Sequence, residues 1–216
     1  YATNADATTI LCGQELYPQV RPLLADKALT HAIVAAYSDA IAVPTDLTLP
    51  DSVKAPRAAI DEPGVTLWCD VMAASLAPGL SEAGPDDLCV MPYTSGTTGL
   101  PKGCVHTHAT VMNTLVAGGA WFRQGQGSVL LATLPFFHVT GMQGAMNGPI
   151  YMGSTVILMQ RWDRTTAARL IERYQVASWT AISTMVIDFL ANPDIANHDL
   201  SSLRQMSGGG AAMPEA

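Results

Sequence analysis

The chain has 216 residues, of which 49% are hydrophobic and 13% charged, so its composition excludes a disordered protein and can supply a large buried core. The formal net charge is −7, from 11 Lys and Arg against 18 Asp and Glu, which argues against nucleic acid or an anionic membrane surface as a partner. The four cysteines include no C-x-x-C pair, which favours reduced thiols in a cytoplasmic protein over disulfides or zinc.

The first part of the chain alternates between strand and helix patterns. Strands are predicted at residues 8–12, 31–37 and 87–93, and helices at residues 14–24 and 68–76, the first of them interrupted near its two prolines. Prolines scattered over residues 42–64 predict a long surface connection. This alternation indicates an α/β fold.

Residues 93–103, YTSGTTGLPKG, concentrate hydrogen-bond donors directly after the third predicted strand. The glycines allow backbone conformations that turn N–H groups toward one anion, and the hydroxyls and the lysine add donors and a positive charge. The residues concerned are Gly96, Gly99 and Gly103, the hydroxyl residues Thr94, Ser95, Thr97 and Thr98, and Lys102. This composition predicts a polyphosphate site.

The nucleotide-binding loop G-x-x-x-x-G-K-[ST] is the first alternative, because the separation of Gly96 and Lys102 matches it. However, Pro101 replaces its second glycine and Gly103 replaces its magnesium-binding hydroxyl. Both chemical roles are unfilled, which argues against an NTPase of that class. A simple surface loop is the second alternative, but it would not need a lysine preceded by a proline.

A helix is predicted after the loop, with Thr107 as its N-cap and small or apolar residues at helical spacing (Ala109, Met112, Val116 and Gly119). His106 and His108 are two residues apart, so they would lie on different faces of a helix, which argues against a metal site there. Gly125-Gln-Gly127 predicts an internal boundary, between a first subdomain of residues 1–125 and part of a second of residues 126–216.

The second half alternates again. Strands are predicted at residues 128–132, 155–159, 176–181 and 203–206, and helices at residues 141–151, 163–174 and 184–190, with Asp163 capping the second helix and Ala167, Leu170, Ile171 and Tyr174 on one of its faces. Arg123 is the one charged residue between Lys102 and Arg161. Prolines, glycines and polar residues interrupt this run, so it predicts a buried core and not a membrane span.

The loop at residues 93–103 resembles, over its full length, the phosphate loop of the adenylate-forming (AMP-binding) superfamily, which includes acyl-CoA synthetases, peptide-synthetase adenylation domains and luciferases. Residues 134–142, LPFFHVTGM, and residues 207–213, SGGGAAM, resemble two further family segments in family order, although the family usually has proline where this chain has Ala212. The resemblance covers nearly the whole chain and is greatest to a fatty-acid or other acyl-CoA ligase. It implies layered α/β/α sheets, as part of the large N-terminal domain.

The resemblance also implies roles for residues. Lys102 and His138 would be catalytic, with His138 beside the reacting carboxylate, and residues 179–185 would help to wall the acyl pocket. ATP would be bound by Thr94, Ser95, Gly96, Thr97, Thr98, Gly99 and Lys102 at its phosphates, with Mg²⁺ at Thr94, and by Gly209, Gly210 and Ala211 at its adenine. Without the resemblance, the alternatives are a core histidine donating to a backbone carbonyl for His138 and a simple loop for residues 207–213.

The implied reaction is ATP-dependent activation of a carboxylic acid to an acyl-adenylate with release of pyrophosphate, followed by thioester formation with coenzyme A. The flexible methionines Met142, Met146 and Met185 favour a medium or long fatty acid as the substrate. The family's magnesium-binding glutamate, ribose-binding aspartate and second lysine would lie beyond Ala216, so the chain is expected to be a fragment that is inactive alone. The alternative is a noncatalytic α/β binding module that keeps the loop.

Overall fold

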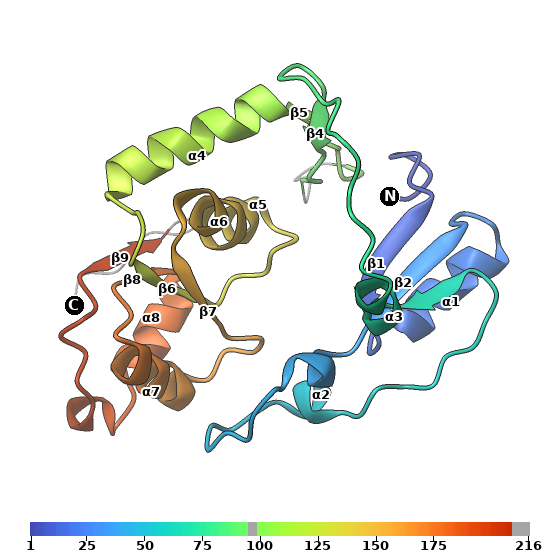
Figure 1. The fold of residues 1–216 in the computed structure, drawn as a ribbon. Helices are drawn as coiled ribbons and strands as arrows, with labels where there is room; N and C mark the ends of the chain where they lie inside the picture. The colour runs from blue at the N-terminus through green and yellow to red at the C-terminus, as the bar shows by residue number, and fades with distance from the viewer. Residues whose placement is uncertain (95–98, 209–216) are drawn as a thin grey trace. The chain divides into compact units, whose positions relative to one another are not determined.

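The computed structural model describes residues 1–94 and 99–208, and the chain divides into two compact units, Tyr1–Glu82 and Ala83–Ala216 (Figure 1). Each unit contains its own parallel sheet with helices packed against it, which confirms the predicted α/β class. In the described ranges, no helix is both long and apolar enough to cross a membrane.

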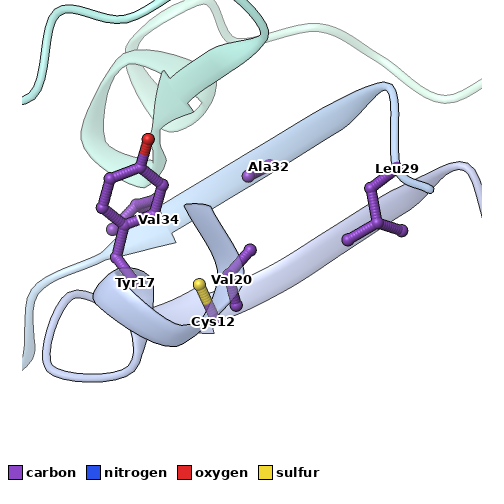
Figure 2. Packing of buried hydrophobic residues seen from close by; sticks show 6 residues of the cluster. All are labelled: Cys12, Tyr17, Val20, Leu29, Ala32 and Val34. Atoms are coloured by element: carbon purple, nitrogen blue, oxygen red, sulfur yellow. The ribbon is translucent and has the colours of Figure 1, made fainter. Parts of the chain in front are cut away.

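The first unit is built on a three-stranded parallel sheet in the order β1-β2-β3, with β1 at Thr9–Gly13, β2 at His31–Ala35 and β3 at Val65–Leu67. Helix α1 spans Tyr17–Ala25 and α3 spans Trp68–Ala73, so both predicted helices are confirmed. Figure 2 shows the buried core between α1 and the sheet, formed by Cys12, Tyr17, Val20, Leu29, Ala32 and Val34. Burial raises the pKa of the Cys12 thiol, and all four cysteines are free.

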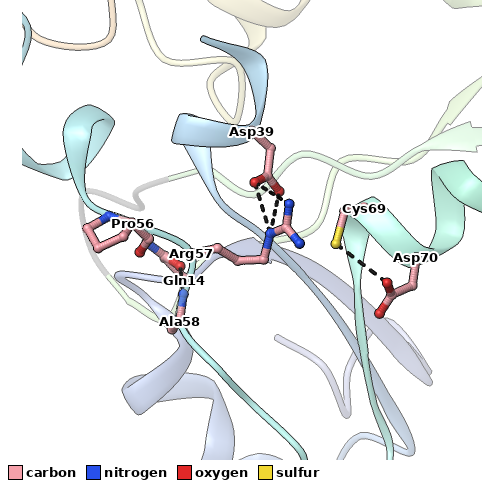
Figure 3. A network of polar contacts seen from close by, with 7 residues as sticks. All are labelled: Gln14, Asp39, Pro56, Arg57, Ala58, Cys69 and Asp70. Carbon is pink, nitrogen blue, oxygen red and sulfur yellow. Dashed lines mark hydrogen bonds and ion pairs between the residues drawn. The ribbon is translucent and has the colours of Figure 1, made fainter. Parts of the chain in front are cut away.

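The proline-containing connection of the first unit includes the short helices η1 (Tyr37–Ala40) and α2 (Asp51–Lys54). Side chains attach it to the turn that follows β1 (Figure 3). The Gln14 amide donates to the Pro56 carbonyl at 3.0 Å and accepts from the Ala58 N–H at 2.7 Å, while the Arg57 guanidinium donates to Asp39 at 2.9 Å. The predicted surface connection is therefore a fixed part of this unit, and it leads into β3, a strand too short to have a periodic signal.

The second unit begins with an antiparallel hairpin of β4 (Leu88–Val90) and β5 (His106–Thr107). Helix α4 (His108–Phe122) follows at once, and the Thr107 hydroxyl accepts from the Thr110 N–H at 3.3 Å, which confirms the predicted N-cap. The sequence placed the loop between a strand and this helix, and the short return strand β5 was not predicted. The buried side of α4 carries Val111 and Leu115.

The second sheet has the order β7-β6-β8-β9, and all its strands are parallel: β6 at Val129–Ala132, β7 at Thr155–Leu158, β8 at Ser178–Ala181 and β9 at Gln205–Gly208. Helix α7 (Arg164–Tyr174) begins at Asp163, whose carboxylate accepts from the Thr166 N–H at 2.7 Å as predicted, and α8 spans Ser183–Leu190. These two helices lie on the opposite side of the sheet from α4 (Figure 1). Both faces are thus covered, as parallel sheets require.

The helix predicted over residues 141–151 consists of three segments: α5 (Val139–Gly141), the π-helix η2 (Met142–Asn147) and α6 (Gly148–Met152). A single α-helix was therefore the wrong prediction. Gly141 has no room for a side chain, because an added Cβ would collide with the Pro135 carbonyl.

Helix α4 and the segment η2–α6 contact each other, although the glycines at residues 125–127 lie between them in the sequence. The Gln143 amide of η2 donates to the Thr114 hydroxyl of α4 at 2.7 Å, and Gly119 of α4 faces Met152 of α6. The compact units consequently divide after Glu82, a different position from the boundary predicted at residues 125–127.

Candidate functional site

The predicted phosphate loop is the tip of the β4–β5 hairpin. Beyond the two strands, the Thr94 N–H donates to the Lys102 carbonyl at 3.0 Å, the Cys104 N–H donates to the Pro92 carbonyl at 2.8 Å, and Tyr93 and Gly103 form an isolated bridge. This ladder holds both ends of the loop together. It brings Thr94 and Lys102, which are eight residues apart, to one place.

The described residues of the loop are available to a ligand. Thr94, Gly99 and Lys102 are exposed, and the Lys102 ammonium has no carboxylate partner among residues 1–94 and 99–208. Gly103 is confined, since an added Cβ would lie 2.8 Å from the Met91 sulfur. A lysine ammonium with no carboxylate partner in those ranges, beside the exposed Thr94 side chain, is suited to a phosphate group. Ser95, Gly96, Thr97 and Thr98 lie outside the described residues, as do Gly209, Gly210 and Ala211.

His138 precedes α5 and caps it. Its Nδ1 accepts from the Thr140 N–H at 3.2 Å, and the side chain is exposed. The alternative of a core histidine that donates to a carbonyl is therefore wrong. Because Nδ1 accepts, a neutral ring carries its proton on Nε2, which leaves that N–H free to donate to a ligand.

A small cavity of about 160 Å³ lies between α4, η2 and the sheet. The carboxyl ends of β8 and β9 form its floor, where the Thr180 and Ser207 hydroxyls are 3.1 Å apart. Gly118 of α4 and Gly144 of η2 line it, and a Cβ added at either glycine would meet no atom within 4 Å. Ligands of parallel α/β sheets bind at this end of the strands.

The residues predicted to wall an acyl pocket divide into two groups. Thr180 lines the cavity, whereas Trp179 is 1% exposed and stacks on Trp162 in the core at a centroid distance of 5.3 Å. The cavity is lined by Met152 and by none of the three methionines that the sequence singled out. The sequence analysis did not predict that α4 lines this cavity. The available signal was the pair of glycines at 118 and 119 within an apolar helix.

Comparison with known proteins decides the family. The model of the AMP-binding enzyme family matches residues 2–216. The chain belongs to the AMP-binding enzyme family. This family assignment confirms the resemblance drawn from the sequence.

Curated members of the family match over part of the chain. The long-chain-fatty-acid–CoA ligase of Bacillus subtilis is 34% identical over 131 residues, 59% of this chain and 23% of its own length. The 4-coumarate–CoA ligase CCL1 of Humulus lupulus is 33% identical over 135 residues, 60% of this chain and 24% of its own length. The matches therefore span about a quarter of these curated relatives.

Solved structures of the family share the fold. The inhibitor-bound N-terminal domain of FACL13 from Mycobacterium tuberculosis has a TM-score of 0.70 at 25% identity, over 99% of this chain and 61% of that one. ATP-bound MatB from Rhodopseudomonas palustris has a TM-score of 0.70 at 20% identity, over 97% of this chain and 36% of that one. The two units of this chain thus have the architecture found in N-terminal domains of adenylate-forming enzymes.

Proposed function

We propose that this chain is the acid-activating part of an ATP-dependent acid–CoA ligase. The observation that carries this proposal is the β4–β5 hairpin, which presents Thr94 and Lys102 together at the predicted phosphate loop. Membership of the AMP-binding family and the ATP-bound neighbour support the same reading. We further propose that the complete enzyme acts in the cytoplasm.

In the proposed first step, a carboxylate oxygen of the acid attacks the α-phosphorus of ATP. The bond from that phosphorus to the bridging oxygen breaks, and pyrophosphate leaves with the electron pair. Both reactants are anionic, so the barrier falls when fixed donors and cations neutralise them. Lys102 and the loop donors have this role at the β- and γ-phosphates and on the departing pyrophosphate. Mg²⁺, when bound beside Thr94, adds charge neutralisation of the same kind.

In the proposed second step, the coenzyme A thiol loses its proton to solvent and its sulfur attacks the acyl carbon, the bond from that carbon to the bridging oxygen breaks, and AMP leaves with that oxygen and the electron pair. We propose that His138 contacts the acid in both steps, and its exposed ring, with Nδ1 held by the Thr140 N–H, supports this role. The Nε2–H then donates to a carboxylate oxygen and orients the acid. The adenine is held by Gly209, Gly210 and Ala211, which follow the end of β9.

We propose a medium or long fatty acid as the substrate, with part of its acyl chain in the cavity of about 160 Å³ between α4 and η2. Leu115, Phe122 and Met152 give that cavity apolar walls, and the glycines leave space between the helices. A Cβ at Gly144 would meet no atom within 4 Å, so Gly144→Leu should narrow this space and shift the preferred acid to a shorter chain. Gly125→Leu is the matched control, since Gly125 also has open space and does not line the cavity.

The experiment that tests this function is pyrophosphate exchange into ATP by the complete enzyme, measured with a panel of aliphatic and aromatic acids. Exchange should occur only when an acid is present, and aliphatic acids should give the highest rates. Preference for benzoate-type acids would contradict the fatty-acid assignment. Absence of exchange with every acid would contradict the ligase function and favour a noncatalytic binding module.

A further inference from the structure

A second and larger cavity lies at the opposite ends of the same strands. Its volume is about 650 Å³, within the range of small-molecule sites. It is lined by the carboxyl end of α4, by Ser128 just before β6, and by the first residues of β8 and β9. All of these belong to the unit Ala83–Ala216. The cavity shares Phe122 and Gln124 with the proposed acyl site, but its arginines and Ser178 lie at the amino ends of the strands.

The residues that line this cavity carry positive charge, although the chain as a whole is acidic. Arg123 and Arg204 line it, and no acidic residue does, although the chain has a net charge of −7. Neither guanidinium has a carboxylate partner in residues 1–94 and 99–208. Elsewhere in those ranges, ion pairs join Arg21 to Glu62, Arg57 to Asp39 and Arg164 to Asp188. Two unpaired guanidinium groups at one cavity form a site for a doubly charged anion.

Backbone hydrogen bonds set the positions from which both arginines extend. Arg123 ends α4 in the left-handed conformation, with φ at 51°, and its N–H donates to the Gly119 carbonyl. A non-glycine residue is uncommon in this conformation, where glycine would be the ordinary choice. Arg204 donates its N–H to the Ala177 carbonyl at 3.0 Å, directly before β8. The backbones of the two arginines are therefore held near the amino ends of the strands.

Two further residues indicate what kind of anion the cavity accepts. Ser178 is 8% exposed, and among the described residues its hydroxyl has no hydrogen-bond partner although it is buried. A buried hydroxyl of this kind is costly unless a ligand or a water satisfies it. Trp121 is 82% exposed, which presents a flat aromatic surface at the cavity. An exposed indole is a stacking surface for a planar ring.

We propose that this cavity is a second nucleotide site, which binds a nucleoside monophosphate with its phosphate between Arg123 and Arg204 and its base on Trp121. The site would act apart from the acid-activating reaction, because the proposed ATP site is at the phosphate loop and the opposite end of the sheet.

The test is a calorimetric titration of the complete enzyme with AMP. The binding component assigned to this cavity should weaken about tenfold or more in Arg123→Gln/Arg204→Gln, since each arginine provides charge-assisted hydrogen bonds. The same component should persist in Lys102→Ala, which alters the proposed ATP site. Arg161→Gln is the matched control, because Arg161 is exposed and does not line the cavity.

Trp121→Ala provides a second test that does not depend on the arginines. The Trp121 side chain is largely exposed, so its removal should leave the fold intact. It should weaken AMP binding and leave orthophosphate binding unchanged. Unchanged AMP binding in the double arginine variant would overturn the site, and equal affinity for AMP and orthophosphate in the unmodified enzyme would overturn the role of Trp121. Pyrophosphate exchange measured on the same variants distinguishes failure of this site from failure of the proposed function, because exchange should be unaffected.

Discussion

Trp179 is the largest fully buried side chain of the described residues, at 1% exposure. Its ring stacks on Trp162 and meets the edge of Phe189 at a centroid distance of 5.3 Å, while its indole N–H donates to the Thr133 hydroxyl at 3.0 Å. These contacts fix α8 against the sheet. The residue therefore contributes to the site only indirectly, by holding β8 in position.

Replacing Trp179 by alanine should lower the free energy of unfolding by about 3–5 kcal/mol, because it removes a fully packed aromatic side chain and leaves a cavity. Trp121→Ala should change it by less than about 0.5 kcal/mol, since that side chain is 82% exposed. Urea denaturation of both variants measures the difference. Equal losses would contradict the described packing of the second unit.

Gly141 is a second position where one residue decides the local fold. An added methyl group would collide with the Pro135 carbonyl, which belongs to the segment that carries His138. Gly141→Ala should therefore lower stability by about 1–3 kcal/mol and displace His138. Gly144→Ala is the matched control, because the same methyl group meets open space there. Thermal unfolding of the two variants should differ, and a Gly141→Ala protein as stable as the control would show that the segment 135–141 is not held as described.

At the scale of elements, α7 has both of its ends secured by acidic side chains. Asp163 caps its first turn, and Glu172 near its last turn accepts from the Asp199 N–H at 3.2 Å and lies 2.8 Å from the His198 Nδ1. The His198 contact, followed by the Asp199 N–H, lowers the pKa of Glu172. The helix is thereby joined to the chain that leads into β9.

A lowered pKa in the folded state means that the Glu172 contact stabilises the protein above the ordinary glutamate pKa of about 4.5 and is lost as the pH falls below that value. Glu172→Gln should therefore lower the melting temperature at pH 6 and have a smaller effect at pH 3.5. Melting curves across this range measure the change. A difference between the two proteins that grew as the pH fell would contradict the assignment.

Sequence patterns predicted the elements of the second sheet because its central strands β6 and β8 are largely buried and its helices α7 and α8 have a cap or an apolar face. Asp163 and Thr107 acted as the predicted caps. The return strand β5 has two residues and β3 has three, so neither could show a period. The π-helix lies between Gly141, which packs against the Pro135 carbonyl, and Gly148, whose N–H donates to the Gln143 carbonyl, and the sequence pattern predicted neither contact.

The predicted phosphate site rests on a contiguous motif, so the sequence alone could assign Thr94 and Lys102 to the same site. The Thr94 and Lys102 backbones meet because the hairpin folds back on itself. The cavity beside Gly118 and Gly144 could not be predicted in the same way, because α4 and η2 are separate segments of the sequence and no contiguous motif joins them.

At the scale of the whole molecule, the chain spans about a quarter of its curated relatives, and we propose that it does not catalyse acid activation alone. Each compact unit has its own sheet, so the isolated 216-residue chain should fold. Charge neutralisation by residues outside it would be missing, and each lost contact of this kind costs about 100-fold in rate. The purified chain should melt cooperatively yet form no acyl-adenylate. Turnover near the rate of the complete enzyme would show that its catalytic groups all lie within residues 1–216.

The most direct test of the central claim is pyrophosphate exchange by the complete enzyme with Lys102→Ala, measured at saturating acid. Exchange should fall by about 100-fold or more, because the ammonium group at the phosphate loop neutralises charge in the transition state. Lys27→Ala is the control, since Lys27 is an exposed lysine of the other compact unit. Exchange by Lys102→Ala at the rate of the control would contradict the assignment of residues 93–103 as the catalytic phosphate loop.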